Sequence, residues 1–166
     1  MMKYLVAYYT LTGNTEFVAG KLAEILGALP ERIQTVKPIK IQDLRGFHLS
    51  NILLVQSIIS HKKARIEKPV QNAQDFDRII IATPVWMNNP PPAVNSYIDG
   101  QNFRSKEVAV IATTLGGGSA HNTFSVINSG IARRGGKVIA MHEIKLDGLG
   151  DEDIIEAVGQ IAKGLG

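Results

Sequence analysis

Six consecutive residues near the amino terminus combine several hydrogen-bond donors with one glycine: Thr10, Leu11, Thr12, Gly13, Asn14 and Thr15. The three threonine hydroxyls and the asparagine amide are donors, and the glycine lets the backbone turn tightly. The segment joins an apolar run to a helical pattern, so unsatisfied N–H groups of the first helical turn would lie beside it. These six residues, called loop 1 below, predict a phosphate-binding loop that relies on neutral donors and on the positive end of a helix.

Two other phosphate-binding motifs do not fit loop 1. A P-loop requires a Gly-Lys-Ser/Thr sequence, and loop 1 contains no lysine. The dinucleotide fingerprint Gly-x-Gly-x-x-Gly requires three glycines, whereas loop 1 has one. An ordinary N-capped helix start would also use Thr or Asn, but a cap needs one hydroxyl and loop 1 has three.

A second segment, called loop 2, runs from Thr83 to Asn89 and contains the only tryptophan of the chain. Its candidate binding residues are Thr83, Pro84, Val85, Trp86, Met87 and Asn88. Trp86 offers an aromatic face for a planar ring, and Met87 adds a polarisable sulfur. A tryptophan that caps the core is the alternative for Trp86. Asn88 and Asn89 tolerate positive φ better than most residues, or they form a simple turn before the prolines.

A third segment, called loop 3, runs from 114 to 119 and contains three successive glycines. Its candidate binding residues are Thr114, Leu115, Gly116, Gly117 and Gly118. Backbone N–H groups without neighbouring side chains can approach the edge of a ligand closely. A flexible connection between a strand and a helix is the alternative.

The composition is that of a globular protein without covalent cross-links. The 166 residues predict one domain, 1–166, and include no cysteine, which excludes disulfides and thiolate metal sites. The first ten residues are too short and too quickly polar for a signal peptide, and no apolar run approaches the ~20 residues of a membrane helix. A cytoplasmic protein is therefore expected. The net charge of +3 gives no reason to expect a nucleic-acid partner.

Apolar runs and helical spacing alternate along the chain and predict its elements. The expected strands are Lys3–Tyr9, Arg32–Ile39, Asp77–Thr83, Glu107–Thr113 and Lys137–Lys145. The expected helices are Glu16–Leu29 with Pro30 after it, a helix from Pro91 or Pro92 to about Ile98, one with Ala120, Phe124, Ile127 and Ile131 on its inner face, and Asp151–Leu165 capped by Asp151. Leu44–Ser60 fits a helix or a strand, and its length favours the helix.

This alternation predicts an α/β protein with a parallel sheet that helices cover on both faces. Loop 1 resembles the FMN-phosphate loop of the flavodoxin family, Ser/Thr-x-Thr-Gly-x-Thr. The resemblance implies a flavodoxin-like three-layer sandwich with a five-stranded parallel sheet in the order 2-1-3-4-5. In that fold a ligand lies at the carboxyl ends of the first, third and fourth strands, which the three loops follow.

The resemblance also implies FMN as the cofactor and a role for each loop. Loop 1 would hold the phosphate, loop 2 would flank the ring, and loop 3 would meet the pyrimidine side. In the family a peptide of loop 2 flips on reduction so that its carbonyl accepts from flavin N5, and the pair Asn88-Asn89 resembles that feature. The chain differs from flavodoxins in being basic and in lacking the tyrosine that many of them stack on the flavin.

Three functions are compatible with the resemblance. The first is an electron carrier with non-covalent FMN, no catalytic side chain and a redox partner protein. The second is an FMN-dependent NAD(P)H:quinone-type oxidoreductase, for which an oligomer is usual. The third is an interaction module that has lost the flavin, and the intact loop 1 argues against it. The sequence has no clear nicotinamide-nucleotide motif, which favours the carrier.

Charge leads to expectations about the redox potential and the partner. Loops 2 and 3 contain no Asp, Glu, Lys or Arg. The potential for the second electron is therefore expected to be less negative than in acidic flavodoxins. Basic residues occur at His61–Lys68 and at Arg133, Arg134 and Lys137. An acidic partner is expected if these residues flank the flavin edge, and ordinary solvated faces are the alternative.

Overall fold

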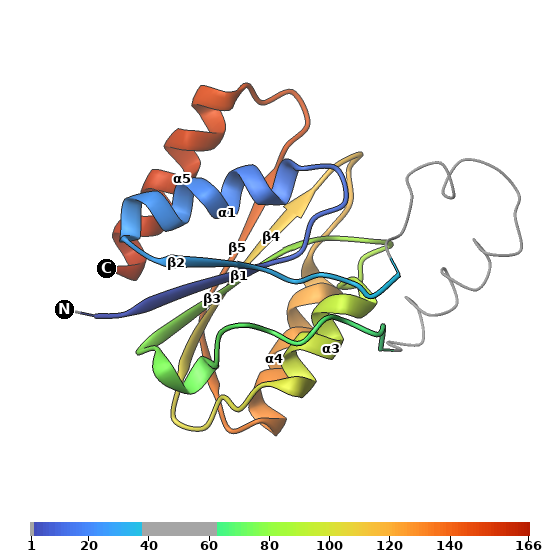
Figure 1. Cartoon of the computed structure of the whole chain (residues 1–166). Coiled ribbons are helices and arrows are strands. Elements are labelled where there is room, and N and C mark those ends of the chain that lie inside the picture. The colour runs from blue at the N-terminus through green and yellow to red at the C-terminus, as the bar shows by residue number, and fades with distance from the viewer. Residues whose placement is uncertain (1, 38–62) are drawn as a thin grey trace, which may run out of the picture.

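The computed structural model describes residues 2–37 and 63–166. Five strands form one parallel sheet in the order β2-β1-β3-β4-β5, as the sequence predicts (Figure 1). The strands are β1 Tyr4–Tyr8, β2 Leu29–Arg32, β3 Arg78–Pro84, β4 Glu107–Thr114 and β5 Lys137–Lys145. The helices within the described residues are α1 Asn14–Leu26, α3 Pro92–Gly100, α4 His121–Arg133, α5 Asp151–Leu165 and a short 3₁₀ turn, η2, Ala73–Asp75.

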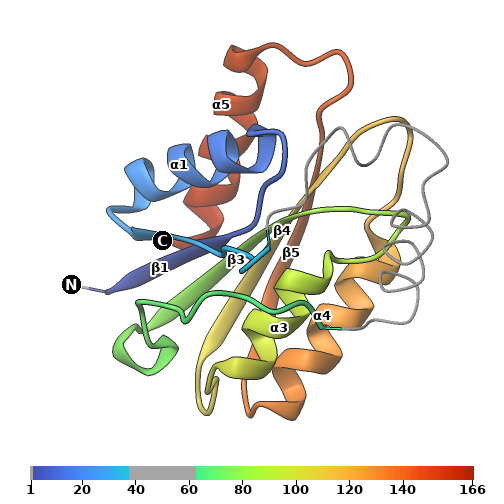
Figure 2. The ribbon, with the colours of Figure 1, turned by 45° about the vertical axis from the view of Figure 1, so that its right-hand side comes forward.

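Helices cover both faces of the sheet. Helices α1 and α5 lie on one face, and α3 and α4 lie on the other (Figures 1 and 2). The run Ile79-Ile80-Ile81 of β3 is fully buried. Successive side chains of a strand point to opposite faces, and helices cover both faces of this sheet. Ile79 and Ile81 join the core beneath α3 and α4, whereas Ile80 joins the core beneath α1 and α5. The three-layer sandwich is therefore confirmed.

The start of β2 is the largest difference from the expected elements. Helix α1 ends at Leu26 because Gly27 adopts a left-handed conformation with φ 60°. Pro30 therefore does not end the helix but lies inside β2, which an edge strand tolerates. The strand spans Leu29–Arg32 and shares only Arg32 with the expected strand Arg32–Ile39, and Leu29, expected in the helix, is 44% exposed. Ile25, near the end of α1, is 50% exposed.

The other boundaries differ less. Strand β5 has the expected limits, and α3 begins at Pro92. Helix α5 begins at Asp151, but the capping residue is Gly150, whose N–H donates to Asp153 Oδ2 at 2.8 Å. The hypothesis of a helix within 44–60 lies outside the described residues. In the part of the chain that the structure describes, no helix has the length and apolar character needed to cross a membrane.

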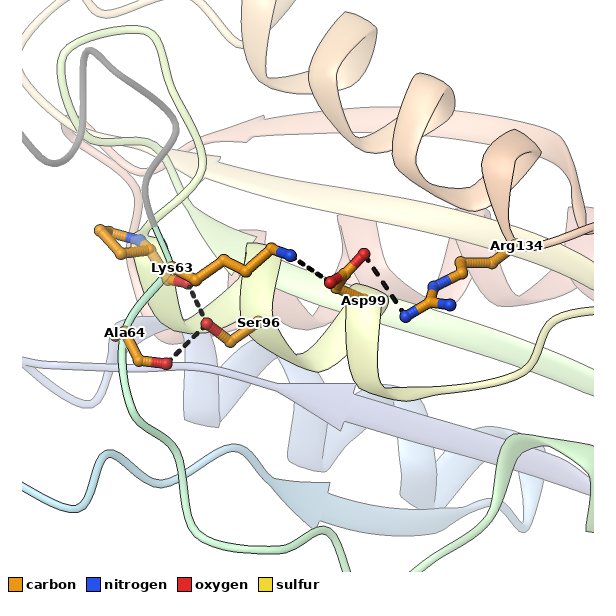
Figure 3. A network of polar contacts seen from close by, with 6 residues as sticks. Lys63, Ala64, Ser96, Asp99 and Arg134 are labelled. Carbon is orange, nitrogen blue, oxygen red and sulfur yellow. Dashed lines mark hydrogen bonds and ion pairs between the residues drawn. The ribbon is translucent and has the colours of Figure 1, made fainter.

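Residues 63–64 are attached to α3 by polar contacts (Figure 3). Ser96 Oγ donates to the carbonyl of Ala64 at 2.7 Å, and the N–H of Ala64 donates to the carbonyl of Pro92 at 3.4 Å. Lys63 donates to Asp99, which also forms an ion pair of 3.4 Å with Arg134. Asp99 therefore joins the chain at residue 63 to the carboxyl end of α4.

Candidate functional site

Loop 1 forms a tight turn between β1 and α1. Gly13 has φ +96°, a conformation that side chains disfavour, and its N–H donates to Thr10 Oγ1 at 2.9 Å. Thr10 and Thr15 are buried, whereas Thr12 and Asn14 are exposed. Within the described residues no side chain caps α1, so its first-turn N–H groups are left to water or a ligand. The local geometry has the features that anion binding requires.

A cleft of about 210 Å³ lies where the three loops meet at the carboxyl edge of the sheet. Its predicted lining residues are Thr10, Leu11, Thr12, Asn14, Thr15, Pro84, Val85, Trp86 and Leu115. Two lining residues, Thr113 and Leu146, were not predicted. Thr113 lies one residue before loop 3, and Leu146 follows β5 and donates from its N–H to the carbonyl of Thr114 at 2.9 Å. No sequence motif marks either residue, because strand pairing brings both to the cleft.

The remaining predicted site residues do not line this cleft. They are Gly13, Thr83, Met87, Asn88, Thr114, Gly116, Gly117 and Gly118. Thr83 and Thr114 belong to the ends of β3 and β4 and are buried. Gly13 shapes loop 1, and the others form the exposed turns around the cleft or the glycine stretch beside it. Their expected contacts with a ligand stay predictions.

Loop 2 contains a two-residue hairpin turn. Trp86 and Asn89 exchange backbone hydrogen bonds of 2.8 and 2.9 Å. The residues between them, Met87 and Asn88, have φ 50° and 61°, as a type I′ turn requires. The pair with positive φ is therefore Met87-Asn88 and not the expected Asn88-Asn89. Met87 is 58% exposed, so the strained backbone is not compensated by burial of its side chain.

Trp86 packs against the core and also lines the cleft. Its ring is half-buried and packs against the core beneath α3 and α4. The ring of Tyr9 meets it edge to face, with centroids 5.7 Å apart and an angle of 75°. Burial raises the pKa of the Tyr9 phenol, and Arg32 opposes that shift. The same tryptophan lines the cleft, so one side chain caps the core and forms a cleft wall.

Loop 3 receives two carboxylates that its own sequence lacks. The N–H of Gly116 donates to Asp147 Oδ1 at 2.8 Å, and Thr114 Oγ1 donates to Glu143 Oε1 at 3.0 Å. Glu143 belongs to β5, and Asp147 follows that strand. Pairing of β4 with β5 therefore brings two carboxylates beside loop 3, at the end of the sheet that also carries Lys145. The expected second potential, which rests only on residues within the loops, stays a prediction.

The basic residues Arg133, Arg134 and Lys137 lie far from the cleft. Lys137 pairs with Glu107 at the amino ends of the strands, whereas Lys145 pairs with Thr114 at the carboxyl ends. At roughly 3.3 Å per residue, β5 places Lys137 about 26 Å from the edge that carries the cleft. Arg133 and Arg134 immediately precede Lys137 at the end of α4. These three residues therefore do not flank the cleft, and the expectation of an acidic partner, which also rested on His61–Lys68, stays a prediction.

A larger cavity of about 340 Å³ lies between β2 and residues 66–71. Its buried carboxylate, Glu31, accepts from the N–H of Gln71 at 2.8 Å and from the Tyr97 hydroxyl at 3.2 Å. Burial, and then the charge and hydrogen bond of Glu31, raise the pKa of Tyr97 so that it stays protonated. Because these groups satisfy one another, the cleft between the three loops is the better candidate for a functional site.

Three solved structures with the same fold were compared with the chain. A protein from Bacteroides uniformis assigned as a flavoprotein has 24% identity and a TM-score of 0.79, covering 95% of this chain and 98% of that one. A protein from Bacteroides eggerthii with the same assignment has 24% identity and a TM-score of 0.75, covering 98% and 99%. A flavoprotein in complex with FMN from Lactobacillus acidophilus has 19% identity and a TM-score of 0.63, covering 96% and 99%.

Identities below 25% establish the fold of this chain and nothing more. Among curated proteins, no sequence matches the chain significantly. The family model described as flavodoxin matches residues 3–147, which include all three loops and every strand. The chain therefore belongs to the flavodoxin family.

Proposed function

We propose that this protein binds FMN without a covalent bond and transfers electrons as a flavodoxin-type carrier. One observation carries the proposal: the hydroxyl-rich loop 1 and the aromatic side chain of Trp86 line the same cleft. Membership of the flavodoxin family supports FMN as the cofactor. The FMN complex of a flavoprotein with the same fold adds to that support.

Loop 1 fits the terminal phosphate of FMN. Thr12 and Asn14 are exposed donors, and the uncapped start of α1 supplies backbone N–H groups with a positive partial charge. Gly13 leaves open space, because a Cβ built on it would meet nothing within 4 Å. Loop 1 contains no cation, so it would hold the dianion with neutral donors and the helix end alone.

The other walls of the cleft fit a planar ring. Trp86 offers an aromatic face, and Val85, Leu115 and Leu146 add apolar surface that excludes water. FMN supplies the one- and two-electron chemistry when it is bound. The protein orients the ring and sets which charge states of the ring are tolerated, through Asp147 and Glu143 beside loop 3. No side chain of the chain is required as an acid, a base or a nucleophile.

Titration of the apoprotein with three flavins tests the cofactor. FMN should bind more tightly than riboflavin, which lacks the phosphate, and more tightly than FAD, whose adenylate must pass loop 1. Quenching of flavin fluorescence measures all three affinities under identical conditions. Equal affinities for FMN and riboflavin would contradict the assignment of loop 1.

Anaerobic mixing with NADH and NADPH tests the carrier role. The FMN-loaded protein should keep its flavin absorbance with either nucleotide and lose it only after a separate NADPH-dependent flavin reductase is added. The absence of a nicotinamide-nucleotide motif in the sequence supports this outcome. Rapid bleaching by either nucleotide alone would instead identify an FMN-dependent NAD(P)H oxidoreductase.

A further inference from the structure

Two buried threonine hydroxyls join loop 1 to the end of β4. Thr15 Oγ1 and Thr113 Oγ1 lie 2.8 Å apart, although 98 positions separate the two residues. The residues are 1% and 4% exposed, and both line the cleft. Thr15 is the last residue of loop 1, so this hydroxyl pair connects the proposed phosphate loop with the sheet.

The backbone of Thr113 is held on both sides by neighbouring strands, opposite Pro84 of β3 and Ile144 of β5. Its carbonyl also accepts from the N–H of Val85 at 3.0 Å, which attaches it to loop 2. A β-branched side chain on such a backbone has a restricted χ1 angle. The hydroxyl of Thr113 is therefore a fixed reference point for the hydroxyl of Thr15.

The direction of this hydrogen bond decides what Thr15 can do. Each hydroxyl has one hydrogen to donate, and either oxygen can be the donor in the pair. A phosphate dianion only accepts. If Thr15 donates to Thr113, it has no hydrogen left for a phosphate. If Thr113 donates to Thr15, the hydrogen of Thr15 is free to point into the cleft.

We infer that Thr113 is a positioning residue for FMN binding, whose hydroxyl donates to Thr15 Oγ1 and thereby directs the Thr15 hydrogen toward the phosphate. The inference rests on the proposed FMN site. A hydroxyl that accepts one hydrogen bond donates a stronger one, and a charged acceptor strengthens it further. Thr113 therefore increases the affinity for the phosphate through Thr15.

Variants of Thr113 separate positioning from packing. Apoprotein carrying Thr113→Val, which keeps the shape and removes the donor, should bind FMN roughly tenfold more weakly than wild type. Its affinity for riboflavin should stay within about twofold of the wild-type value, because riboflavin has no phosphate. Thr113→Ser should restore FMN affinity. Thr113→Cys, whose thiol is a weak donor, should behave as Thr113→Val and replaces it if that variant does not fold.

A double-mutant cycle with Thr15→Val completes the test. In the Thr15→Val protein, Thr113→Val should cause no further loss of FMN affinity, because the hydroxyl that it positions is absent. A loss that persists there, or that is equal for FMN and riboflavin, would overturn the inference. Wild-type FMN affinity in Thr113→Val would overturn this inference but would leave the proposed FMN binding intact. Failure of wild-type protein to bind FMN would refute the proposed function together with it.

Discussion

Thr10 and Thr12 have different tasks although both are threonines of loop 1. Thr10 is buried, and its Oγ1 accepts from the N–H of Gly13, so it holds the turn in shape. Thr12 is exposed at the cleft, where its hydroxyl is accessible to a ligand. Thr12 is therefore the residue at which phosphate binding and loop structure are most easily separated.

Thr12→Val should weaken FMN binding far more than riboflavin binding. A hydrogen bond to a charged group contributes about 1.5–3 kcal/mol, which corresponds to roughly tenfold to a hundredfold in affinity. Parallel titrations of the apoprotein with both flavins measure the difference. Thr12→Ser keeps the hydroxyl and serves as the matched control. Unchanged FMN affinity in Thr12→Val would show that this hydroxyl points away from the phosphate.

Asp147 should lower the potential at which FMN takes its second electron. Reduction adds negative charge to the flavin, and a carboxylate against loop 3 opposes that charge. Asp147→Asn keeps an oxygen that can accept from Gly116, so the second one-electron potential should become less negative without loss of the loop. Asp77→Asn is the control, because Asp77 accepts from the N–H of Lys3 beside β1 at the opposite edge. Anaerobic redox titration decides, and equal shifts in both variants would contradict a local effect.

At the scale of elements, close packing between α4 and β5 leaves no room for a side chain at Gly136. A Cβ built on Gly136 would lie 2.7 Å from Phe103 Cβ and 2.8 Å from Ile131 Cγ2, and both neighbours are fully buried. Gly20, in the middle of α1, is exposed, and a Cβ there would meet nothing within 4 Å. Close packing therefore requires a glycine at position 136, whereas position 20 has room for a side chain.

Gly136→Ala should destabilise the protein, and Gly20→Ala should stabilise it. Overpacking of a core costs about 1–3 kcal/mol. Replacing an exposed helical glycine with alanine gains about 0.5–1 kcal/mol, because the unfolded chain loses freedom. Urea unfolding of the two variants and wild type measures both free energies. A Gly136→Ala protein as stable as wild type would mean that Phe103 and Ile131 can move apart.

The contact between Lys63 and Asp99 of α3 should contribute to the free energy of unfolding at neutral pH, and this contribution should be lost in acid. A hydrogen bond from Lys63, with the charges of Arg134 and Arg133, lowers the pKa of Asp99 below its ordinary value of 3.8. A carboxyl group with a lowered folded pKa stabilises above the unfolded pKa, and this contribution disappears as pH falls through the folded value. Asp99→Asn should therefore cost about 0.2–1 kcal/mol at pH 7, as exposed ion pairs do.

Urea unfolding of Asp99→Asn and wild type at decreasing pH tests this dependence. The difference between the two proteins should be full at pH 7, should begin to decline near the ordinary Asp pKa of 3.8, and should vanish once the pH is below the lowered folded value. Added salt should reduce the difference at pH 7, because both partners are exposed. A difference that is as large in acid as at pH 7 would mean that Asp99 acts through packing.

At the scale of the whole molecule, the basic residues Arg133, Arg134 and Lys137 and the candidate site occupy opposite ends of the sheet. Arg133 and Arg134 lie at the end of α4, and Lys145 lies at the cleft end of β5. Lys137, close behind Arg133 and Arg134 in the chain, lies about 26 Å from the cleft end of β5, which exceeds the Debye length of about 8 Å at physiological salt. Charges at the amino edge should therefore have little effect on electron transfer at the cleft.

Removal of two distant charges should affect electron transfer less than removal of one near charge. Ferricyanide is an anionic acceptor, so its reaction with the reduced FMN protein reports the field at the cleft. Arg133→Gln with Arg134→Gln should leave the rate and its salt dependence unchanged, whereas Lys145→Gln should slow the reaction at low salt. Stopped-flow measurements across ionic strength provide the comparison. A slower rate in the double variant alone would place the flavin edge elsewhere.

Local patterns in the sequence determined most of the fold. Apolar runs identified β1, β3 and β4, because buried parallel strands are apolar on both faces, and they also identified the edge strand β5. Helical spacing identified α1, α3, α4 and α5, and the motif of loop 1 identified the family. These properties can be read from the sequence, because each depends only on residues that are close together in the chain. The bounds of edge strand β2 were predicted wrongly, because its exposed residues and Pro30 lack the apolar pattern of a buried strand.

Tertiary structure alone decided which residues meet at the cleft. Thr113, Leu146, Glu143 and Asp147 reach the three loops only because β4 lies between β3 and β5 in one particular register. The sequence contains no local trace of that register, because it results from packing of residues far apart in the chain. The positive φ of Met87 likewise follows from the hairpin that β3 imposes on loop 2. The loops were predictable because they are continuous segments, and their surroundings were not, because pairing of distant strands creates them.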